Sequence, residues 1–226
     1  MKEWNDLLDY WRPELVRLAT HSDAGDSAHD LNHLNRVWAT ARTLLAAHAH
    51  ADQLVVMAAC YLHDLVNLPK SHPERANASR LSALQAEAQL SKLGFPQEQL
   101  AGVVHAIEAH SYSAQIRPET IEAQIVQDAD RLDALGAVGL ARMLHIGGQL
   151  GRSLAHATDP LATARGLDDK RYTLDHIENK LLRLPMAMNT AEGRELAESR
   201  VQLLVRFRDQ FVAEWLGSAH GVNAIE

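Results

Sequence analysis

The sequence has little that would place the protein in a membrane or outside the cell. Its 226 residues include one cysteine, Cys60, so an intrachain disulfide is excluded, which is typical of a reducing compartment. No apolar stretch reaches the length of about 20 residues that a bilayer span needs. The first residues, MKEWNDLLDYW, lack the continuous apolar segment of a secretory signal. These absences predict a cytoplasmic protein without a membrane partner.

The chain also lacks an excess of positive charge and any pattern typical of β-strands. Its formal net charge of -7 argues against a general nucleic-acid binder, which usually carries a basic face. Small anionic substrates are still allowed, because local fields can oppose the net charge. No run of alternating apolar and polar residues is bounded by turn residues, so no sheet is expected.

Helical periodicity, in contrast, runs through most of the chain. Apolar residues recur at spacings of three and four along segments 33–49, 52–66, 80–94, 98–111, 119–144, 173–185 and 190–216. Two stretches look irregular, residues 67–77 and residues 147–171, and the second is long enough to be a lid or a binding loop. The pattern predicts an all-α helical bundle, with residues 1–226 forming a single domain.

Three stretches of the chain carry imidazole or carboxylate groups beside residues that should be buried. A buried carboxylate is unfavourable unless it is paired, hydrogen-bonded or bound to a metal. Three helices with inward polar groups predict one shared site, and mixed nitrogen and oxygen donors suit Mn, Fe, Co, Ni or Zn better than Ca. The groups are His29, Asp30 and His33; His63, Asp64 and Asn67; and Asp128, Asp130 and Asp133.

The first of these groups has the spacing of a known zinc motif. His29 and His33 are four residues apart, as in H-E-x-x-H, but Asp30 stands where that motif has glutamate. Aspartate is one methylene shorter and would reach a zinc-bound water poorly, so a zinc peptidase is disfavoured. The alternative for His29 is a position near solvent at the start of a helix.

Several stretches together resemble a known family. NHLNRV, YLHDLV and IVQDADRLDALGAVGLAR are similar to the HD-domain metal-dependent phosphohydrolases, whose signature is H…HD…D. HAIEAHSYSAQ, LDDKRY and ENKLLRLP resemble a bacterial branch of that superfamily, some members of which hydrolyse nucleoside triphosphates to monophosphate and pyrophosphate. The resemblance implies an all-α, HD-type helical bundle. Its metal-binding core would span about residues 25–135, with a C-terminal loop and helices at 147–220 packing on it.

The resemblance also implies a metal site. Carried over residue by residue, it makes His33, His63, Asp64 and Asp130 the ligands of a divalent ion. Mn is the favoured ion, and Mg, Fe, Co, Ni and Zn are the alternatives. Such an ion lowers the pKa of bound water and polarises a phosphoryl oxygen. It would also neutralise Asp64, which explains a carboxylate within an apolar run.

Four residues are assigned to catalysis: Asp64, His110, Arg36 and Lys180. Arg36 follows His33 by three residues on nearly the same helix face and would hold phosphate charge, with a salt bridge as the alternative. His110 would contact a phosphate or assist proton transfer. Lys180 precedes an apolar stretch and is preferred to the other loop charges, which are more typical of a solvated face: Lys70, Arg75, Lys170 and Arg171.

Two more residues have open alternatives. His105 is expected to pack rather than to act, although with His110 it would form the histidine pair of a two-metal phosphodiesterase. Asp133 either orients a metal ligand or pairs with Arg131 or Arg142.

One departure from the family pattern concerns the general base. HD enzymes that hydrolyse guanosine tetraphosphate or nucleoside monophosphates typically carry a glutamate three residues on from the HD pair, often followed by aspartate. This chain has Val66 and Asn67 there. The difference disfavours both of those activities and leaves the base unassigned, unless Asp64 serves in two roles. Asn67 could orient a water molecule but cannot take its proton.

The predicted function is hydrolysis of (deoxy)nucleoside triphosphates to monophosphate and pyrophosphate. The alternatives are a phosphomonoesterase or phosphodiesterase acting on nucleotides, including guanosine tetraphosphate or cyclic nucleotides, and a non-catalytic metal-bound sensor. The expected partner is a small-molecule nucleotide, with no nucleic acid. The terminal helix has an apolar face with Phe211 and Trp215. This face is expected to pack in the core, and the alternative is that it forms a homodimer interface.

Overall fold

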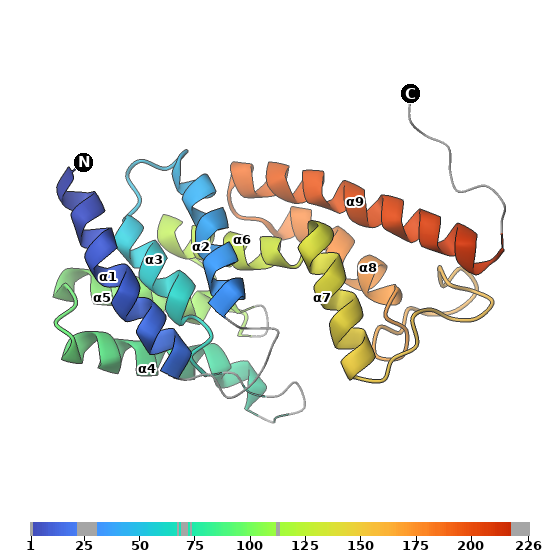
Figure 1. The fold of residues 1–226 in the computed structure, drawn as a ribbon, viewed down its shortest axis with the longest axis horizontal. Coiled ribbons are helices and arrows are strands. Elements are labelled where there is room, and N and C mark those ends of the chain that lie inside the picture. Colours follow the sequence, from blue (N-terminus) through green and yellow to red (C-terminus); the bar gives the residue numbers. More distant parts are fainter. Residues whose placement is uncertain are drawn as a thin grey trace. The chain divides into compact units, whose positions relative to one another are not determined.

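The computed structural model describes residues 2–21, 31–66, 68, 72, 74–111 and 114–217, and every regular element among them is helical (Figure 1). The prediction of an all-α protein is confirmed. No helix among these residues is both long and apolar enough to cross a membrane. The elements are α1 (Lys2–His21), α2 (Leu31–Leu45), α3 (Gln53–Leu62), η1 (Arg75–Asn77), α4 (Ala78–Lys92), α5 (Gln97–His110), α6 (Ile121–Asp133), α7 (Gly136–Gln149), α8 (Asp175–Asn179), η2 (Leu181–Ala187) and α9 (Ala191–Trp215).

The chain divides into two compact units. They are Met1–Asp130, here called the N-terminal unit, and Arg131–Glu226, the C-terminal unit. The boundary falls within α6, which begins at Ile121 and ends at Asp133. That all 226 residues form one domain stays a prediction.

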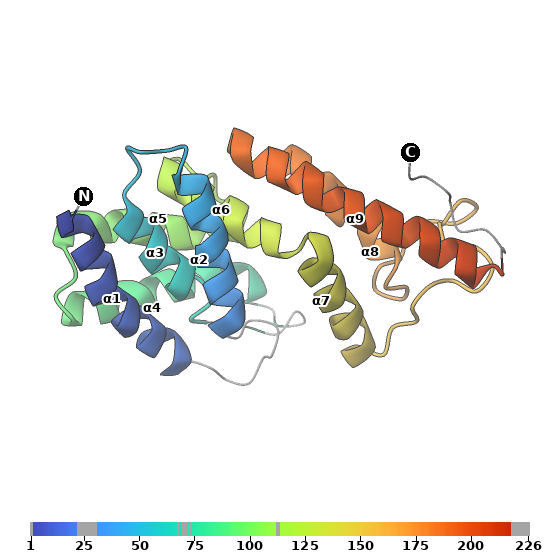
Figure 2. The ribbon, with the colours of Figure 1, turned by 45° about the horizontal axis from the view of Figure 1, so that its top comes forward.

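Helix α3 is the centre of the N-terminal unit. Its residues from Leu54 to Leu62 are all buried, and α1, α2 and α5 pack around it (Figure 2). A helix that is apolar on every side has to be surrounded by other elements in this way. Asp52 caps α3 by accepting hydrogen bonds from the backbone N–H groups of Leu54 and Val55. Helix α4 packs against α5.

A hydrogen-bonded trio joins three helices of this unit. The hydroxyl of Tyr61 on α3 accepts a hydrogen bond from Nε of Arg12 on α1 at 3.1 Å. The same hydroxyl donates to Oδ1 of Asn35 on α2 at 2.9 Å. Tyr61 is buried, so its hydroxyl needs such partners. The trio fixes α2 against α3 two residues after His33 and two residues before His63.

The helix predicted over residues 119–144 is interrupted by a bend. Helix α6 ends at Asp133 and α7 begins at Gly136, whose φ of 71° lies in the left-handed region. Residues with a side chain rarely adopt that conformation. A Cβ on Gly139 would lie 2.1 Å from the carbonyl carbon of Ala134. The bend therefore requires both glycines, and apolar periodicity alone does not reveal it.

In the C-terminal unit, α9 packs against α7 and against η2, which also contacts α8. The helical segment predicted at residues 173–185 is thus a short α-helix followed by a 3₁₀ helix. Along α9 the rings of Phe207, Phe211 and Trp215 follow one another in contact, and the indole N–H of Trp215 donates to the carbonyl of Ala157. Trp215 is nevertheless exposed, and a homodimer interface stays a prediction.

Charged residues hold the irregular stretch after α7. The guanidinium of Arg165 donates two hydrogen bonds to the buried carboxylate of Asp175, at 2.6 and 2.8 Å. It also lies 4.6 Å from the centroid of the Tyr172 ring. Asp159 accepts hydrogen bonds from the backbone N–H groups of Thr163 and Ala164. Bidentate and capping hydrogen bonds therefore order this loop in place of regular structure.

Candidate metal centre

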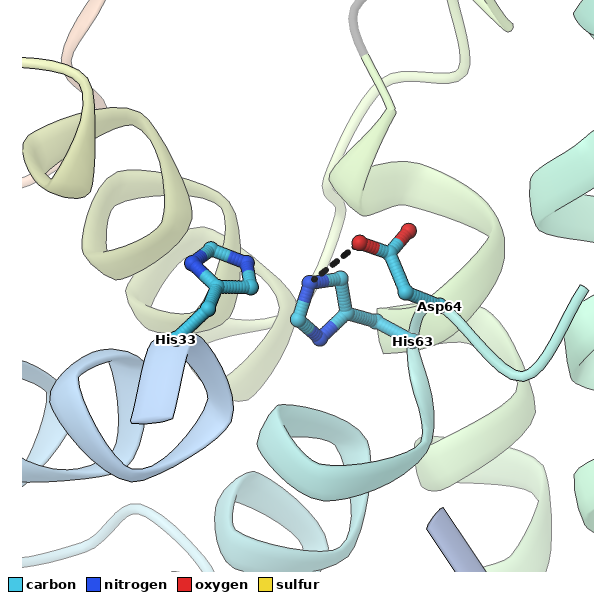
Figure 3. Close-up of side chains that lie close together, drawn as sticks. All are labelled: His33, His63 and Asp64. Atoms are coloured by element: carbon cyan, nitrogen blue, oxygen red, sulfur yellow. Dashed lines mark ion pairs between the residues drawn. The ribbon is translucent and has the colours of Figure 1, made fainter. Parts of the chain in front are cut away.

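Five side chains with metal-binding atoms meet in the N-terminal unit. Nε2 of His63 lies 3.4 Å from Oδ2 of Asp64 (Figure 3) and 3.8 Å from Oδ1 of Asp130. Nε2 of His33 lies 3.5 Å from that same oxygen of Asp130. Nε2 of His110 lies 3.7 Å from Oδ1 of Asp64. The four residues predicted as ligands are therefore neighbours in space, although they come from α2, the end of α3 and α6.

The end of α3 sets the orientation of His63. The helix ends at Leu62, and His63 caps it with its Nδ1 3.0 Å from the carbonyl oxygen of Cys60. Nδ1–H therefore donates to that carbonyl, and in the neutral ring the lone pair is on Nε2, toward the two carboxylates. The thiol of Cys60 takes no part, because burial raises its pKa and keeps it protonated.

The atoms at this centre fit a bound cation. Nε2 of His63 is buried and makes no hydrogen bond within the described part of the chain, which is unfavourable for a polar atom in the interior. One ligand atom each of His33, His63 and Asp64 lies within 4.8 Å of the other two (Figure 3). Donors at about 2.1 Å from one ion are about 3 Å apart when adjacent and about 4.2 Å when opposite. The measured separations are close to that range.

Electrostatics also favour a cation. Burial raises the pKa of the Asp130 carboxyl, but contact with His33 and the nearby rings of His63 and His110 lowers it to well below its ordinary value. Asp130 is therefore ionised at neutral pH. The side chains of Asp130 and Asp64 are only 29% and 20% exposed. Two largely buried carboxylates beside imidazoles that carry no permanent charge form a setting in which a divalent ion would be stabilised.

His110 is held in the same way as His63. Its Nδ1 lies 2.6 Å from the carbonyl oxygen of Ile107, so Nδ1–H donates there and Nε2 faces Asp64. Burial lowers the pKa of His110, and the neighbouring His63 lowers it further, while Asp64 and Asp130 oppose the shift in part. The rings of His63 and His110 lie edge to face with their centroids 4.7 Å apart. A neutral imidazole thus stands beside the candidate ligands.

Comparison with known proteins agrees with this arrangement. The family model of the HD domain matches residues 30–135, which include all five residues of the centre. The uncharacterized protein YpgQ of Bacillus subtilis (strain 168) is 34% identical over 185 residues, which cover 80% of this chain and 82% of YpgQ. The chain belongs to the HD-domain superfamily.

Solved structures share the HD-domain fold of this chain. The crystal structure of Bacillus subtilis YpgQ in complex with ADP is 32% identical and has a TM-score of 0.67, covering 92% of this chain and 100% of that chain. The structure of an HD-superfamily hydrolase from Bacillus thuringiensis is 28% identical and has a TM-score of 0.69, covering 94% of this chain and 98% of that chain. The predicted HD-type fold is confirmed.

The other residues predicted to act lie in different parts of this HD protein. Arg36 is half-buried on α2, and its contact with phosphate stays a prediction. Lys180 lies in the C-terminal unit, exposed directly after α8, and its role also stays a prediction. Four residues considered from the sequence lie outside the described residues: His29, Asp30, Asn67 and Lys70.

Structural contacts account for the residues with open alternatives. Nε2 of His105 accepts a hydrogen bond from the backbone N–H of Glu119 at 2.9 Å, which agrees with the packing role expected for it. Asp133 is buried and pairs with Arg142, one of the two partners considered for it.

The remaining candidates lie on another helix face or on other segments than the five residues of the centre. Asp128 is fully buried on α6, but it is two residues before Asp130 and so lies on a different face of the helix. Arg75 donates a hydrogen bond to a backbone carbonyl. The loop candidates Lys170 and Arg171 are exposed to solvent.

Sequence reasoning missed residues that hold the HD centre in place. Nε2 of Gln127 donates to the carbonyl of Ala109 at 2.6 Å. Oγ of Ser82 accepts from the backbone N–H of Val66 at 3.0 Å, which fixes the chain just after the His-Asp pair. For Gln127 the sequence held one indication, because the residue lies one helical turn before the predicted ligand Asp130. Nothing comparable marks Ser82, because its partner is a backbone group on another segment.

Proposed function

We propose that this protein is a metal-dependent phosphohydrolase that acts on nucleotides and hydrolyses (deoxy)nucleoside triphosphates to monophosphate and pyrophosphate. The observation that carries the proposal is the convergence of the four predicted ligands, with His110 beside them, at one polar centre of an apolar unit. Imidazole and carboxylate donors in this setting suit a catalytic divalent ion.

The ligands of that ion would be His33, His63, Asp64 and Asp130, and Mn is the proposed metal. When bound, the ion would polarise a phosphoryl oxygen and lower the pKa of water. The chain contributes fixed positions for the donors. The Tyr61 trio sets α2 against α3, and the carbonyl of Cys60 orients the ring of His63.

His110 is the residue to which we assign proton transfer. Its Nδ1–H is engaged by the carbonyl of Ile107, so Nε2 is the nitrogen that can accept a proton from the attacking water. The lowered pKa of His110 keeps this nitrogen unprotonated at neutral pH. Asp64, 3.7 Å away, would stabilise the imidazolium that forms. This role supplies the base that Val66 cannot provide.

A nucleotide substrate is supported by one relative. YpgQ has been solved in complex with ADP, which carries the phosphoanhydride group that the proposed reaction requires. Arg36 and Lys180 are proposed to hold phosphate charge, since phosphoryl transfer depends mainly on positioning and electrostatic stabilisation. Replacing either residue with methionine should raise KM more than it lowers kcat, because such contacts bind substrate and transition state alike.

Product analysis tests the proposal. The purified protein is incubated with Mn²⁺ and separate nucleoside triphosphates, diphosphates, monophosphates, guanosine tetraphosphate or cyclic dinucleotides, and the products are separated by ion-pair chromatography. Monophosphate together with pyrophosphate is the expected result. The activity should disappear in Asp64→Ala and persist in Asp9→Ala, a control at an exposed aspartate on α1.

Other products would redirect the assignment. Free nucleoside, or an opened cyclic nucleotide, would identify a phosphomonoesterase or phosphodiesterase. Bound Mn²⁺ without turnover of any nucleotide would identify a metal-bound sensor. Equal activity in the wild type and in Asp64→Ala would show that the turnover comes from a contaminant.

A further inference from the structure

One face of α6 makes two contacts that bear on the HD centre. Asp130 approaches the rings of His33 and His63 from this helix. Gln127 precedes Asp130 by three residues, so both side chains leave the helix on the same face. Gln127 is only 4% exposed, and its amide Nε2 donates to the carbonyl of Ala109 at 2.6 Å.

The acceptor of this hydrogen bond lies at the end of α5. That helix ends at His110, so the carbonyls of its last turn lie beyond the reach of the helix's own hydrogen bonds. Two side chains donate hydrogen bonds to two of these carbonyls. The ring of His110 donates to the carbonyl of Ile107, and Gln127 donates to the carbonyl of Ala109. Ala109 is fully buried, so water has no ready access to its carbonyl.

These contacts link the position of His110 to that of Asp130. The ring of His110 is fixed to its own helix, and the end of that helix is fixed to α6 by Gln127. We infer that Gln127 is a positioning residue that holds Nε2 of His110 at its place opposite Asp64. The inference rests on the proposed function only where it concerns turnover. The placement of the ring is a separate and measurable property.

Gln124 provides a matched control on the same helix. It lies one turn before Gln127, is half-buried, and also donates its amide Nε2 to a backbone carbonyl, that of Pro118, at 3.4 Å. Its acceptor belongs to the segment before α6 and not to α5. Gln124→Met and Gln127→Met therefore remove the same kind of group, and the replacement has a similar length in both.

The kinetic test is a double-mutant cycle with Mn²⁺ as the metal and the triphosphate identified by product analysis. Gln127→Met should lower kcat by about 10- to 100-fold, which is the range for residues that orient metal ligands through hydrogen bonds. It should leave KM within about threefold. In a His110→Ala background the same substitution should change kcat by less than about threefold, because it acts through His110. Gln124→Met should leave kcat close to that of the wild type.

The results that would overturn the inference follow from the cycle. An equal fold loss in both backgrounds would mean that Gln127 acts independently of His110. A similar loss in Gln124→Met would mean that any disturbance of α6 has this effect. Circular dichroism melts show whether Gln127→Met is folded; if it is not, Gln127→Leu, which also lacks the amide donor and adds no charge, replaces it throughout the cycle, with Gln124→Leu as its control.

A spectroscopic test is independent of turnover. In the Zn²⁺-loaded protein, the imidazole ¹H–¹³C signal of His110 is assigned as the one missing in His110→Ala. It should move in Gln127→Met and stay in place in Gln124→Met. An unmoved signal in Gln127→Met would overturn the inference even if the enzyme is active. A moved signal in a protein that turns over no nucleotide would uphold the positioning role while the proposed function fails.

Discussion

The two units of the chain bury carboxylates by different means. In the C-terminal unit, Asp175 has a fully buried side chain and receives two hydrogen bonds from the guanidinium of Arg165. In the N-terminal unit, Asp64 and Asp130 face imidazoles, and each keeps part of its side chain accessible. A guanidinium is permanently charged and balances the charge of its carboxylate, which here also accepts a hydrogen bond from the backbone N–H of Asp168. An imidazole lacks that permanent charge, so the carboxylates beside it can still be balanced by a cation.

This contrast separates a structural pair from a binding centre. The charges of Arg165 and Asp175 cancel, and an added ion would gain nothing there. The HD centre combines two carboxylates with His63 and His110, whose Nδ1 atoms donate to carbonyls of their own segments and whose Nε2 atoms lie near the carboxylate oxygens of Asp64. The first arrangement is expected to support folding, and the second to bind an ion at some expense of stability.

Neutralising one carboxylate at the HD centre should have the largest effect and tests whether this centre binds an ion. Asp130→Asn keeps the size of the side chain but removes its charge. Hydrolytic activity with Mn²⁺ should fall by more than about 100-fold, beyond the range seen for residues that only support a ligand. Steady-state kinetics measure the loss. A loss below tenfold would exclude Asp130 as a metal ligand.

Breaking the pair in the C-terminal unit should affect stability. Arg165→Met leaves Asp175 buried without its charged partner and should lower the free energy of unfolding by about 3 kcal/mol. Urea denaturation measures it. Arg171→Met is the matched control, because Arg171 also lies over the Tyr172 ring, at 5.2 Å, but is exposed; it should change stability by less than about 1 kcal/mol. Equal effects would mean that the ring contact matters and the ion pair does not.

Adding or removing metal should change the stability of the protein through the HD centre and not through the Arg165–Asp175 pair. An ion that binds only the folded chain should stabilise it by about 2.7 kcal/mol at a free concentration of 100 times Kd. Thermal melts with Mn²⁺ and with chelator should show this increase in the wild type and in Arg165→Met. The increase should be absent in Asp130→Asn and in His63→Ala. If it persists in both of these variants, the ion binds elsewhere.

The hydrogen bonds that support the HD centre should contribute less. Tyr61→Phe removes the hydroxyl that joins Arg12 and Asn35 and should cost about 1 kcal/mol of folding stability. It should also weaken Mn²⁺ binding, measured by calorimetry, because α2 is then held less firmly against α3. Tyr10→Phe, at an exposed position on α1, is the control and should be neutral. A neutral Tyr61→Phe would show that packing alone sets the two helices.

The smallest expected effect concerns Asp169. Burial raises the pKa of this carboxyl, but the hydrogen bonds with His176, at 2.7 Å, and with Asn179, together with the charges of His176 and Arg152, lower it more, so the net pKa lies below its ordinary value. A depressed pKa stabilises the fold above the ordinary carboxyl pKa of about 3.9, and the gain is lost as pH falls through the lower folded value. Asp169→Asn should cost less than about 1 kcal/mol at pH 7. Thermal melts from pH 7 to pH 3 should show a shallower acid loss than in the wild type, and an unchanged slope would contradict the assignment.

Much of this molecule could be predicted from the sequence. Apolar spacing marked the α-helical segments after residue 30, but not α1, because each of them buries one face, or in α3 every face. The resemblance to HD enzymes selected His33, His63, Asp64 and Asp130, which the structure brings close together. The bend between α6 and α7 was missed, because it depends on the left-handed backbone of Gly136 and leaves the apolar spacing intact.

The supporting contacts were beyond the reach of sequence reasoning for a common physical reason. Gln127, Ser82 and Arg165 each bind a group on another segment, and in the first two cases that group is a backbone atom. A backbone carbonyl or N–H has no residue identity, so no pattern of letters indicates which side chain will meet it. Only the folded chain pairs them.

The carbonyl of Cys60 that orients His63 has a practical consequence for labelling. A main-chain oxygen is present whatever the side chain at position 60, so Cys60→Ala or Cys60→Ser should keep the tautomer of His63. Since Cys60 is the sole cysteine of the chain, either change yields a thiol-free background. A single reporter cysteine could then be placed on the exposed surface of either unit, and a spin label or fluorophore there would follow the protein during turnover with the histidine cluster left intact.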